Sequence, residues 1–140
     1  MNPEPGREHR WLQQLVGQWA FESEANMGPG EPLHTSAGTE TTRAVGDLWI
    51  QGELREVVEG SEMTNLLTLG FDPARGQFVG TFVSSMAPNL WIYSGQLEGD
   101  VLTLDTEGPA MTGDGGTARY QDILELRDGE RVFRSRMQGA

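Results

Sequence analysis

The chain has 140 residues, 36% hydrophobic and 22% charged, and its ten basic residues, all arginine, face 21 acidic ones for a formal net charge of −11. This composition is typical of one globular domain over residues 1–140, and its acidity argues against binding to nucleic acid or to an anionic membrane, which both need a basic face. The absence of cysteine excludes disulfides and thiol chemistry, and the absence of lysine excludes Schiff-base chemistry on a side-chain amine.

The N-terminal segment predicts one short helix and no targeting signal. The first ten residues, MNPEPGREHR, have no apolar stretch of the kind found in a secretory signal peptide, so we expect a cytoplasmic protein. No apolar run approaches the roughly 18 residues that cross a bilayer. Residues Glu8–Val16 place Trp11, Leu12, Leu15 and Val16 on one side of a helix, and Gly17 ends it.

From residue 18 onward, the pattern changes to the period of two that β-strands have. Eight turn signals rich in Gly, Asp and Pro recur at short intervals and separate nine strand-like runs. The short connections favour antiparallel neighbours, and closing the sheet hides its edges. We therefore predict an all-β, up-and-down antiparallel β-barrel of about nine or ten strands with the helix near one end. The predicted strands are Gln18–Met27, Leu33–Ala44, Leu48–Val58, Glu62–Phe71, Gln77–Met86, Leu90–Leu97, Val101–Thr106, Thr117–Arg127 and Arg131–Gln138.

Two of these strands have one face that combines aromatic and polar side chains. Trp49 shares a face with Glu53 and Arg55, and Trp91 shares one with Tyr93. Such a mixture is expected of a ligand-bearing cavity wall. The alternative is an amphipathic aromatic on the outer surface, and alternation alone does not decide between the two.

A first resemblance to known proteins lies at the junction of the helix and the first strand. The segment Gly17-Gln-Trp19 resembles the Gly-x-Trp signature of lipocalins, fatty-acid-binding proteins and their calycin relatives. The resemblance implies that Trp19 packs across the closed end of the barrel.

A second resemblance covers nearly the whole chain and is carried by residues 9–19, 38–43, 68–73, 78–82, 90–93, 102–109 and 118–122. These stretches are similar to those of a bacterial family catalogued only as domain of unknown function 1579, which implies a lipocalin-like fold with no established activity. Members of that family usually carry one more strand, so the resemblance predicts an open seam beside the first strand. A second copy could pair there and form a homodimer.

The candidate ligand-binding residues combine aromatic, soft and charged side chains. Trp and Tyr supply large contact areas with a polar handle, methionine suits irregular apolar pockets, and Arg55 or Arg119 could hold a ligand carboxylate. These residues could equally fill a small barrel, and for the methionines filling is the favoured interpretation. The predicted set is Trp49, Glu53, Arg55, Met86, Trp91, Tyr93, Arg119 and Tyr120.

Other constellations give little support for catalysis or for a cofactor. His9 and His34 lack the spacing of a zinc site, and nothing marks His34 as a haem ligand, so we expect both to be surface or rim residues with no metal or cofactor bound. Glu40 and Glu53 are candidate general bases, but cross-strand ion pairs with neighbouring arginines on a solvated face are the favoured interpretation.

Two functional hypotheses from different classes follow. The first is non-catalytic binding of a small, mostly apolar molecule inside the barrel, and this molecule could carry an acidic group. The second is a structural role, with a filled barrel and a homodimer formed through strand edges. An enzyme that uses a cavity carboxylate ranks last.

Overall fold

The computed structural model describes residues 4–26, 30–32, 34–58, 60–110 and 115–137. One short helix precedes nine strands, as the alternation predicted, and most strand bounds agree with the prediction within two residues. The helix is shorter than predicted and β7 is three residues longer, because Gly108 and Pro109 still pair with Ala118 and Thr117. The elements are α1 (Arg7–Gln13), β1 (Gly17–Asn26), β2 (His34–Val45), β3 (Trp49–Val58), β4 (Ser61–Asp72), β5 (Gln77–Ser84), β6 (Ala87–Glu98), β7 (Val101–Pro109), β8 (Thr117–Arg127) and β9 (Glu130–Met137).

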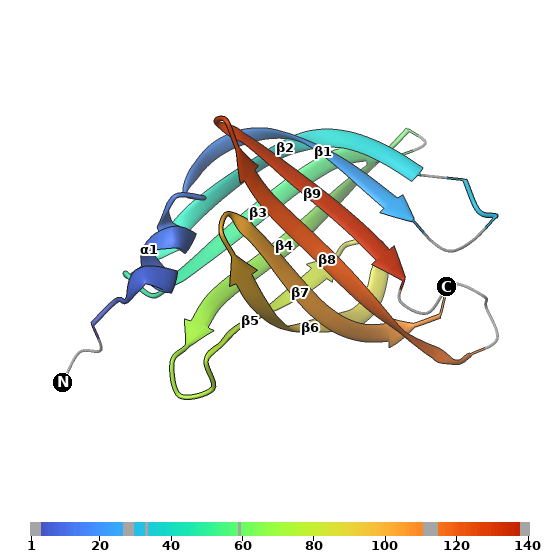
Figure 1. Cartoon of the computed structure of the whole chain (residues 1–140). Helices are drawn as coiled ribbons and strands as arrows, with labels where there is room; N and C mark the ends of the chain where they lie inside the picture. Colours follow the sequence, from blue (N-terminus) through green and yellow to red (C-terminus); the bar gives the residue numbers. More distant parts are fainter. Residues whose placement is uncertain (1–3, 27–29, 33, 59, 111–114, 138–140) are drawn as a thin grey trace.

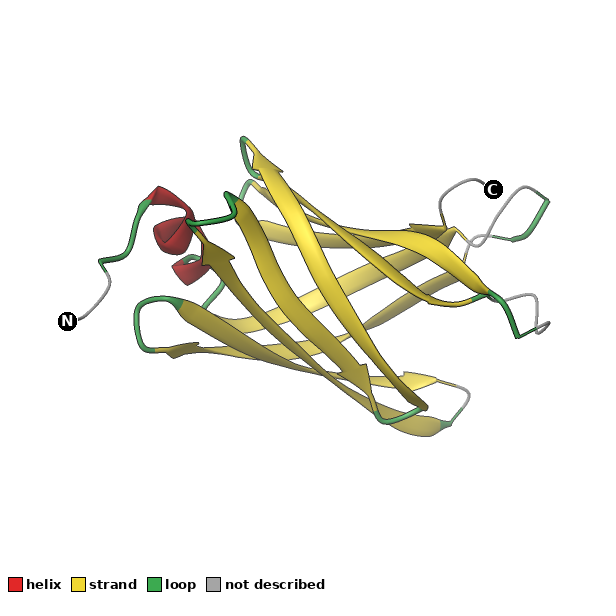
Figure 2. Cartoon of the chain, turned by 90° about the horizontal axis from the view of Figure 1, so that it is seen from below, coloured by secondary structure: helices red, strands yellow, loops and turns green. Residues whose placement is uncertain are grey.

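The nine strands form a closed barrel in chain order, with α1 at one end (Figures 1 and 2). Consecutive strands are antiparallel, but β1 and β9 close the barrel in parallel. An odd number of alternating strands brings the first and last together in the same direction, so the barrel is mixed rather than purely antiparallel. The predicted open seam is closed over one half only, where residues 22–26 of β1 pair with residues 132–136 of β9.

One face of each strand is buried in the barrel, as the alternation requires. The cross-strand registers align these inward positions into a continuous apolar core. The side chains in this core that are almost completely buried are Leu12, Leu15, Ile50, Leu67, Leu69, Phe78, Leu102, Leu104 and Leu124.

The helix closes one end of the barrel, which we call the helix end. Trp11 of α1 is buried, meets the ring of Phe78 edge-on, and donates from Nε1 to Asp100 Oδ1 at 3.0 Å. His9 is also buried, contrary to the expectation of a surface residue: its Nδ1 accepts from Gly6 N at 2.9 Å, so Nε2 donates to the Phe71 carbonyl at 3.0 Å. His9 therefore ties the helix to the end of β4.

Trp19 anchors the junction between α1 and β1. Its Nε1 donates to the Leu15 carbonyl at 2.7 Å. This bond satisfies a carbonyl near the end of the helix and fixes the angle at which the chain enters the barrel. None of the helices in the described part of the chain has the length and apolar character needed to span a membrane.

Candidate functional site

A pocket of about 170 Å³ lies inside the barrel, towards the end opposite α1, which we call the far end. Its walls come from the five consecutive strands β5 to β9. Aromatic rings dominate the lining, and three polar side chains complete it. The residues that line it are Phe82, Trp91, Thr106, Tyr120, Asp122, Phe133 and Ser135.

The aromatic wall of this pocket is held by close packing. The Trp91 and Tyr120 rings meet edge-to-face with centroids 5.3 Å apart, an arrangement that the ring quadrupoles favour. Trp91 lies over Gly108 of β7, where a Cβ would come within 2.1 Å of the indole ring. Tyr120 donates from its hydroxyl to the Pro109 carbonyl at 2.6 Å. Glycine at 108 is therefore required by the position of Trp91.

The polar wall is centred on the Asp122 carboxylate. Asp122 Oδ1 accepts from Ser135 Oγ at 2.6 Å, and Oδ2 accepts from the Tyr93 hydroxyl. No ion pair of the described residues includes Asp122. The third polar residue, Thr106, donates to the Ile92 carbonyl at 2.8 Å and so satisfies its own hydroxyl.

Burial perturbs the titration of this pair. Removal from water raises the pKa of Asp122 above its ordinary 3.8, and the hydrogen bonds from Ser135 and Tyr93 oppose the rise by stabilising the carboxylate. Burial also raises the pKa of Tyr93 well above 10.0, with the Asp122 charge adding to the effect. Tyr93 is therefore a neutral hydrogen-bond donor, and Asp122 is a carboxylate whose charge the protein stabilises poorly.

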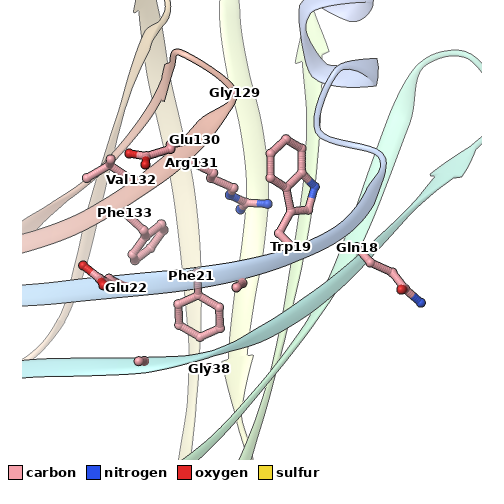
Figure 3. A pocket seen from close by; sticks show the side chains of 12 residues that line it. Gln18, Trp19, Phe21, Glu22, Gly38, Gly129, Glu130, Arg131, Val132 and Phe133 are labelled. Atoms are coloured by element: carbon pink, nitrogen blue, oxygen red, sulfur yellow. The ribbon is translucent and has the colours of Figure 1, made fainter.

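A second pocket, of about 500 Å³, lies where β1 and β9 separate beyond their paired residues. Figure 3 shows Trp19 of β1 and Arg131 and Phe133 of β9 in the space between the two strands, with Phe21 over Gly38 of β2. We call this the seam pocket. It lies beside the part of the barrel where the parallel pairing of β1 and β9 is absent.

A buried ion pair lies behind the seam pocket. Arg131 donates to Glu40 Oε2, and both side chains are only 1% exposed. Thr42 donates to the same oxygen. Burial lowers the pKa of Arg131, and the Glu40 carboxylate opposes this effect. The only cation that we find among the described inward side chains is thus committed to a protein carboxylate.

Several other interior acceptors have no hydrogen-bond donor. Among the described residues these buried atoms are Glu40 Oε1, Glu56 Oε2, Asn65 Oδ1 and Asn89 Oδ1. Glu56 and Asn65 are 9% and 5% exposed on the neighbouring strands β3 and β4. Buried polar atoms without partners are rare and unfavourable in folded proteins. The interior is therefore short of donors rather than acceptors.

Three of the eight predicted ligand-binding residues belong to the interior of the far end. Trp91 and Tyr120 line the far-end pocket, and Tyr93 lies behind it, bonded to Asp122. In β6 the face with Trp91 and Tyr93 therefore points inward, which is one of the two alternatives that the sequence left open. Their ligand-binding role itself stays a prediction.

The other five lie on the outside of the barrel. In β3 the buried face is that of Ile50 and Leu54, so Trp49, Glu53 and Arg55 point outward. Trp49 covers Gly70, where a Cβ would meet its ring at 2.4 Å, so the indole packs on the outer face of the sheet. Met86, 59% exposed, lies in the turn between β5 and β6, and Arg119 borders an outer polar groove. The expectation that all eight share the cavity was wrong for these five, because an aromatic with polar neighbours is compatible with either face.

The two candidate general bases, Glu40 and Glu53, lie on different sides of the barrel wall. Glu53 makes an exposed ion pair with Arg55 at 3.1 Å, but the two residues lie on the same strand β3, so the pair is solvated as predicted and not cross-strand. Glu40 is instead inside the barrel, paired with Arg131 from the opposite end of the chain. Of the histidines, His9 is structural, and the side chain of His34 lies outside the described residues. Within the part of the chain that the structure describes, no three His, Asp or Glu side chains converge as a metal site would require.

Sequence reasoning missed most of the residues that line the far-end pocket. Phe82, Thr106, Asp122, Phe133 and Ser135 were not among the predicted site residues. Asp122 and Phe82 could have been found, because Asp122 is two residues from Tyr120 on the same face and Phe82 faces Trp91 in the antiparallel pairing. The β9 residues had no such signal, because their place in the pocket depends on barrel closure.

The fold and the pocket define a small closed β-barrel whose helix end is filled and whose far end holds an aromatic pocket with one carboxylate. The family model described as "Protein of unknown function (DUF1579)" matches residues 4–140, so the chain belongs to this family. No curated protein matches the chain.

Proposed function

We propose that this protein binds a small, mostly apolar molecule in the far-end pocket and performs no chemistry on it. The observation that carries the proposal is the pocket itself, a space of about 170 Å³ lined by aromatic rings with three polar side chains. Ligand sites in proteins combine mostly apolar walls with a few polar groups in this way. A dry cavity of roughly 150 Å³ can hold one benzene molecule, so the expected ligand has about one ring.

A saturable signal from Trp91 would test this proposal. Bromobenzene has one apolar ring and a heavy atom that quenches indole fluorescence on contact. We expect saturable quenching in the intact protein, and its loss in Trp91→Phe. The matched control is Trp49→Phe on the outer face, which should keep the saturable component. Quenching that rises linearly without saturation, or that survives Trp91→Phe, would reject binding at this pocket.

A strand-edge homodimer is a second candidate, and the seam between β1 and β9 favours it. The pairing of these two strands begins only at Glu22 of β1 and Val132 of β9, so the earlier part of β1 offers an edge to another strand. Light scattering at micromolar concentration would show a dimer if a second copy pairs there. Only monomer in that measurement would reject this candidate.

A further inference from the structure

The inner face of the barrel presents an excess of negative charge and of acceptor atoms. Its described side chains include the carboxyl groups of Glu40, Glu56 and Asp122 and one guanidinium, that of Arg131. Because Arg131 is bonded to Glu40, it does not serve the other two carboxyl groups. The Asp122 carboxylate of the far-end pocket thus has no cationic partner among the described residues, although each of its oxygens accepts a hydrogen bond from a neutral hydroxyl.

This arrangement excludes the acidic ligand group that the sequence suggested. Arg55 and Arg119, the residues expected to hold a ligand carboxylate, are on the outer face. A carboxylate in the far-end pocket would instead lie against Asp122, and two like charges in a buried site repel strongly. The charge of the pocket favours the opposite kind of ligand.

The far-end pocket combines the two elements that bind organic cations. Asp122 supplies a carboxylate whose two described partners, Ser135 and Tyr93, are neutral donors. Phe82, Trp91, Tyr120 and Phe133 supply aromatic rings around it. A cation within about 6 Å of an aromatic ring centroid is attracted by the ring quadrupole, and protein cages for ammonium groups use this attraction.

We infer that the far-end pocket binds a small organic cation, a protonated amine with about one ring, whose charge lies between Asp122 and the ring of Trp91 or Tyr120. The inference rests on the proposed binding function and names the chemical class of its ligand. The ammonium group supplies the positive charge that Asp122 lacks among its described partners, and a single ring suits a pocket of about 170 Å³. The net charge of −11 attracts such a cation from solution.

Benzylamine and benzyl alcohol are the probes that separate charge from shape. They have the same ring and the same one-carbon arm, but only the amine is charged. We expect calorimetry on the intact chain at pH 8 to give an affinity for benzylamine at least about tenfold higher, since hydrogen bonds to charged groups are the stronger ones. Equal affinities for the two probes would overturn the cation inference and leave the proposed function standing. Binding of neither probe, together with linear bromobenzene quenching, would reject both.

Variants assign the charge effect to Asp122. Asp122→Asn should lower benzylamine affinity about tenfold and change benzyl alcohol affinity less than about twofold. Ser135→Ala keeps the carboxylate while removing one of its donors, so it should retain the preference for the amine. Asp105→Asn is the matched control, because Asp105 is exposed on the outer face of the adjacent strand β7. An equal loss of benzylamine affinity in Asp105→Asn and Asp122→Asn would mean that only the overall charge attracts the amine.

The pH profile provides a readout that a structural role of Asp122 would not give. Benzylamine stays protonated from pH 4 to pH 8, whereas Asp122 loses its charge as the pH falls through its raised pKa. Benzylamine affinity should therefore fall with pH in the intact protein, while benzyl alcohol affinity stays constant. In folded Asp122→Asn, confirmed by circular dichroism, the benzylamine profile should be flat. A profile unchanged by this substitution would overturn the inference.

Discussion

The two ends of the barrel are built from the same strands but filled in different ways. At the helix end, Phe78 of β5 packs between the rings of Trp11 and Phe71, with centroids 6.3 and 4.9 Å away. At the far end of the same strand, Phe82 borders a pocket and Asp122 lies opposite. Both phenylalanines point inward on one strand, only four residues apart.

The difference separates stability from binding within one small domain. Close packing at the helix end supplies the buried apolar area that folds the chain, and α1 excludes water there. The far end keeps an unfilled space and a poorly stabilised carboxylate, both of which lower the free energy of unfolding. Natural binding sites often carry such a cost, because a surface suited to a ligand is incomplete without it. The sequence left open whether the barrel is filled or hollow. In the structure the helix end is filled and the far end is hollow.

The largest expected effect comes from emptying the helix end. Phe78→Ala should lower the free energy of unfolding by about 3–5 kcal/mol, because it creates a cavity among rings that cannot collapse onto one another. Phe82→Ala is the matched control, and it should cost about half as much, since Phe82 already borders empty space and is partly exposed. Urea unfolding followed by circular dichroism measures both. Equal losses would show that the two ends do not differ in packing.

The next effect concerns the ion pair between the two ends. Arg131→Met should cost about 3 kcal/mol, because it leaves Glu40 buried without its cation. Arg134→Met on the same strand should cost less than about 0.5 kcal/mol, since its pair with Glu125 is partly exposed to water, whereas the Arg131 pair is buried. Adding Glu40→Leu to Arg131→Met should recover most of the loss. If the double variant is as unstable as Arg131→Met alone, the loss is one of packing and not of charge.

A smaller, pH-dependent effect is expected at the far end. The raised pKa of Asp122 means that the folded protein binds a proton more tightly than the unfolded chain, so this residue reduces stability as the pH rises above 3.8. The reduction is about 1.4 kcal/mol for each tenfold difference in the proton dissociation constant of Asp122 between the folded and the unfolded protein. As the pH rises from 4, the free energy of unfolding of the parent should therefore fall relative to that of Asp122→Asn. A difference that is constant with pH would contradict this assignment.

The smallest effect is expected on the outer face. Glu53→Gln removes a charge that pairs with Arg55 at 3.1 Å, and both side chains are about half exposed to water. We expect a change below about 0.5 kcal/mol and no change in benzylamine affinity. Chemical denaturation and calorimetry on the same preparation measure both. A loss of amine binding in Glu53→Gln would instead place the binding site on the outer face of β3, which the sequence had indicated.

The alternation of side chains predicted the fold well because it is a local property. The strand Thr117–Arg127 was predicted with the bounds that the structure has, and Trp91 and Tyr93 were correctly assigned to the same face of their strand. The same reasoning failed for Trp49, since a period of two divides a strand into two faces without saying which one is buried. That choice depends on the neighbouring strand, where Gly70 leaves room for the Trp49 ring on the outside.

The sequence by itself determined the number of strands, their order and the helix that precedes them, because turn residues and alternation act over a few neighbouring positions. Only the tertiary structure decided that Glu40 and Arg131, 91 residues apart, form a buried pair, and that Asp122 shares a pocket with Phe82 and Phe133. These contacts exist because β9 returns to β1 and closes the barrel. Closure joins residues across the whole chain, and no local pattern contains that information.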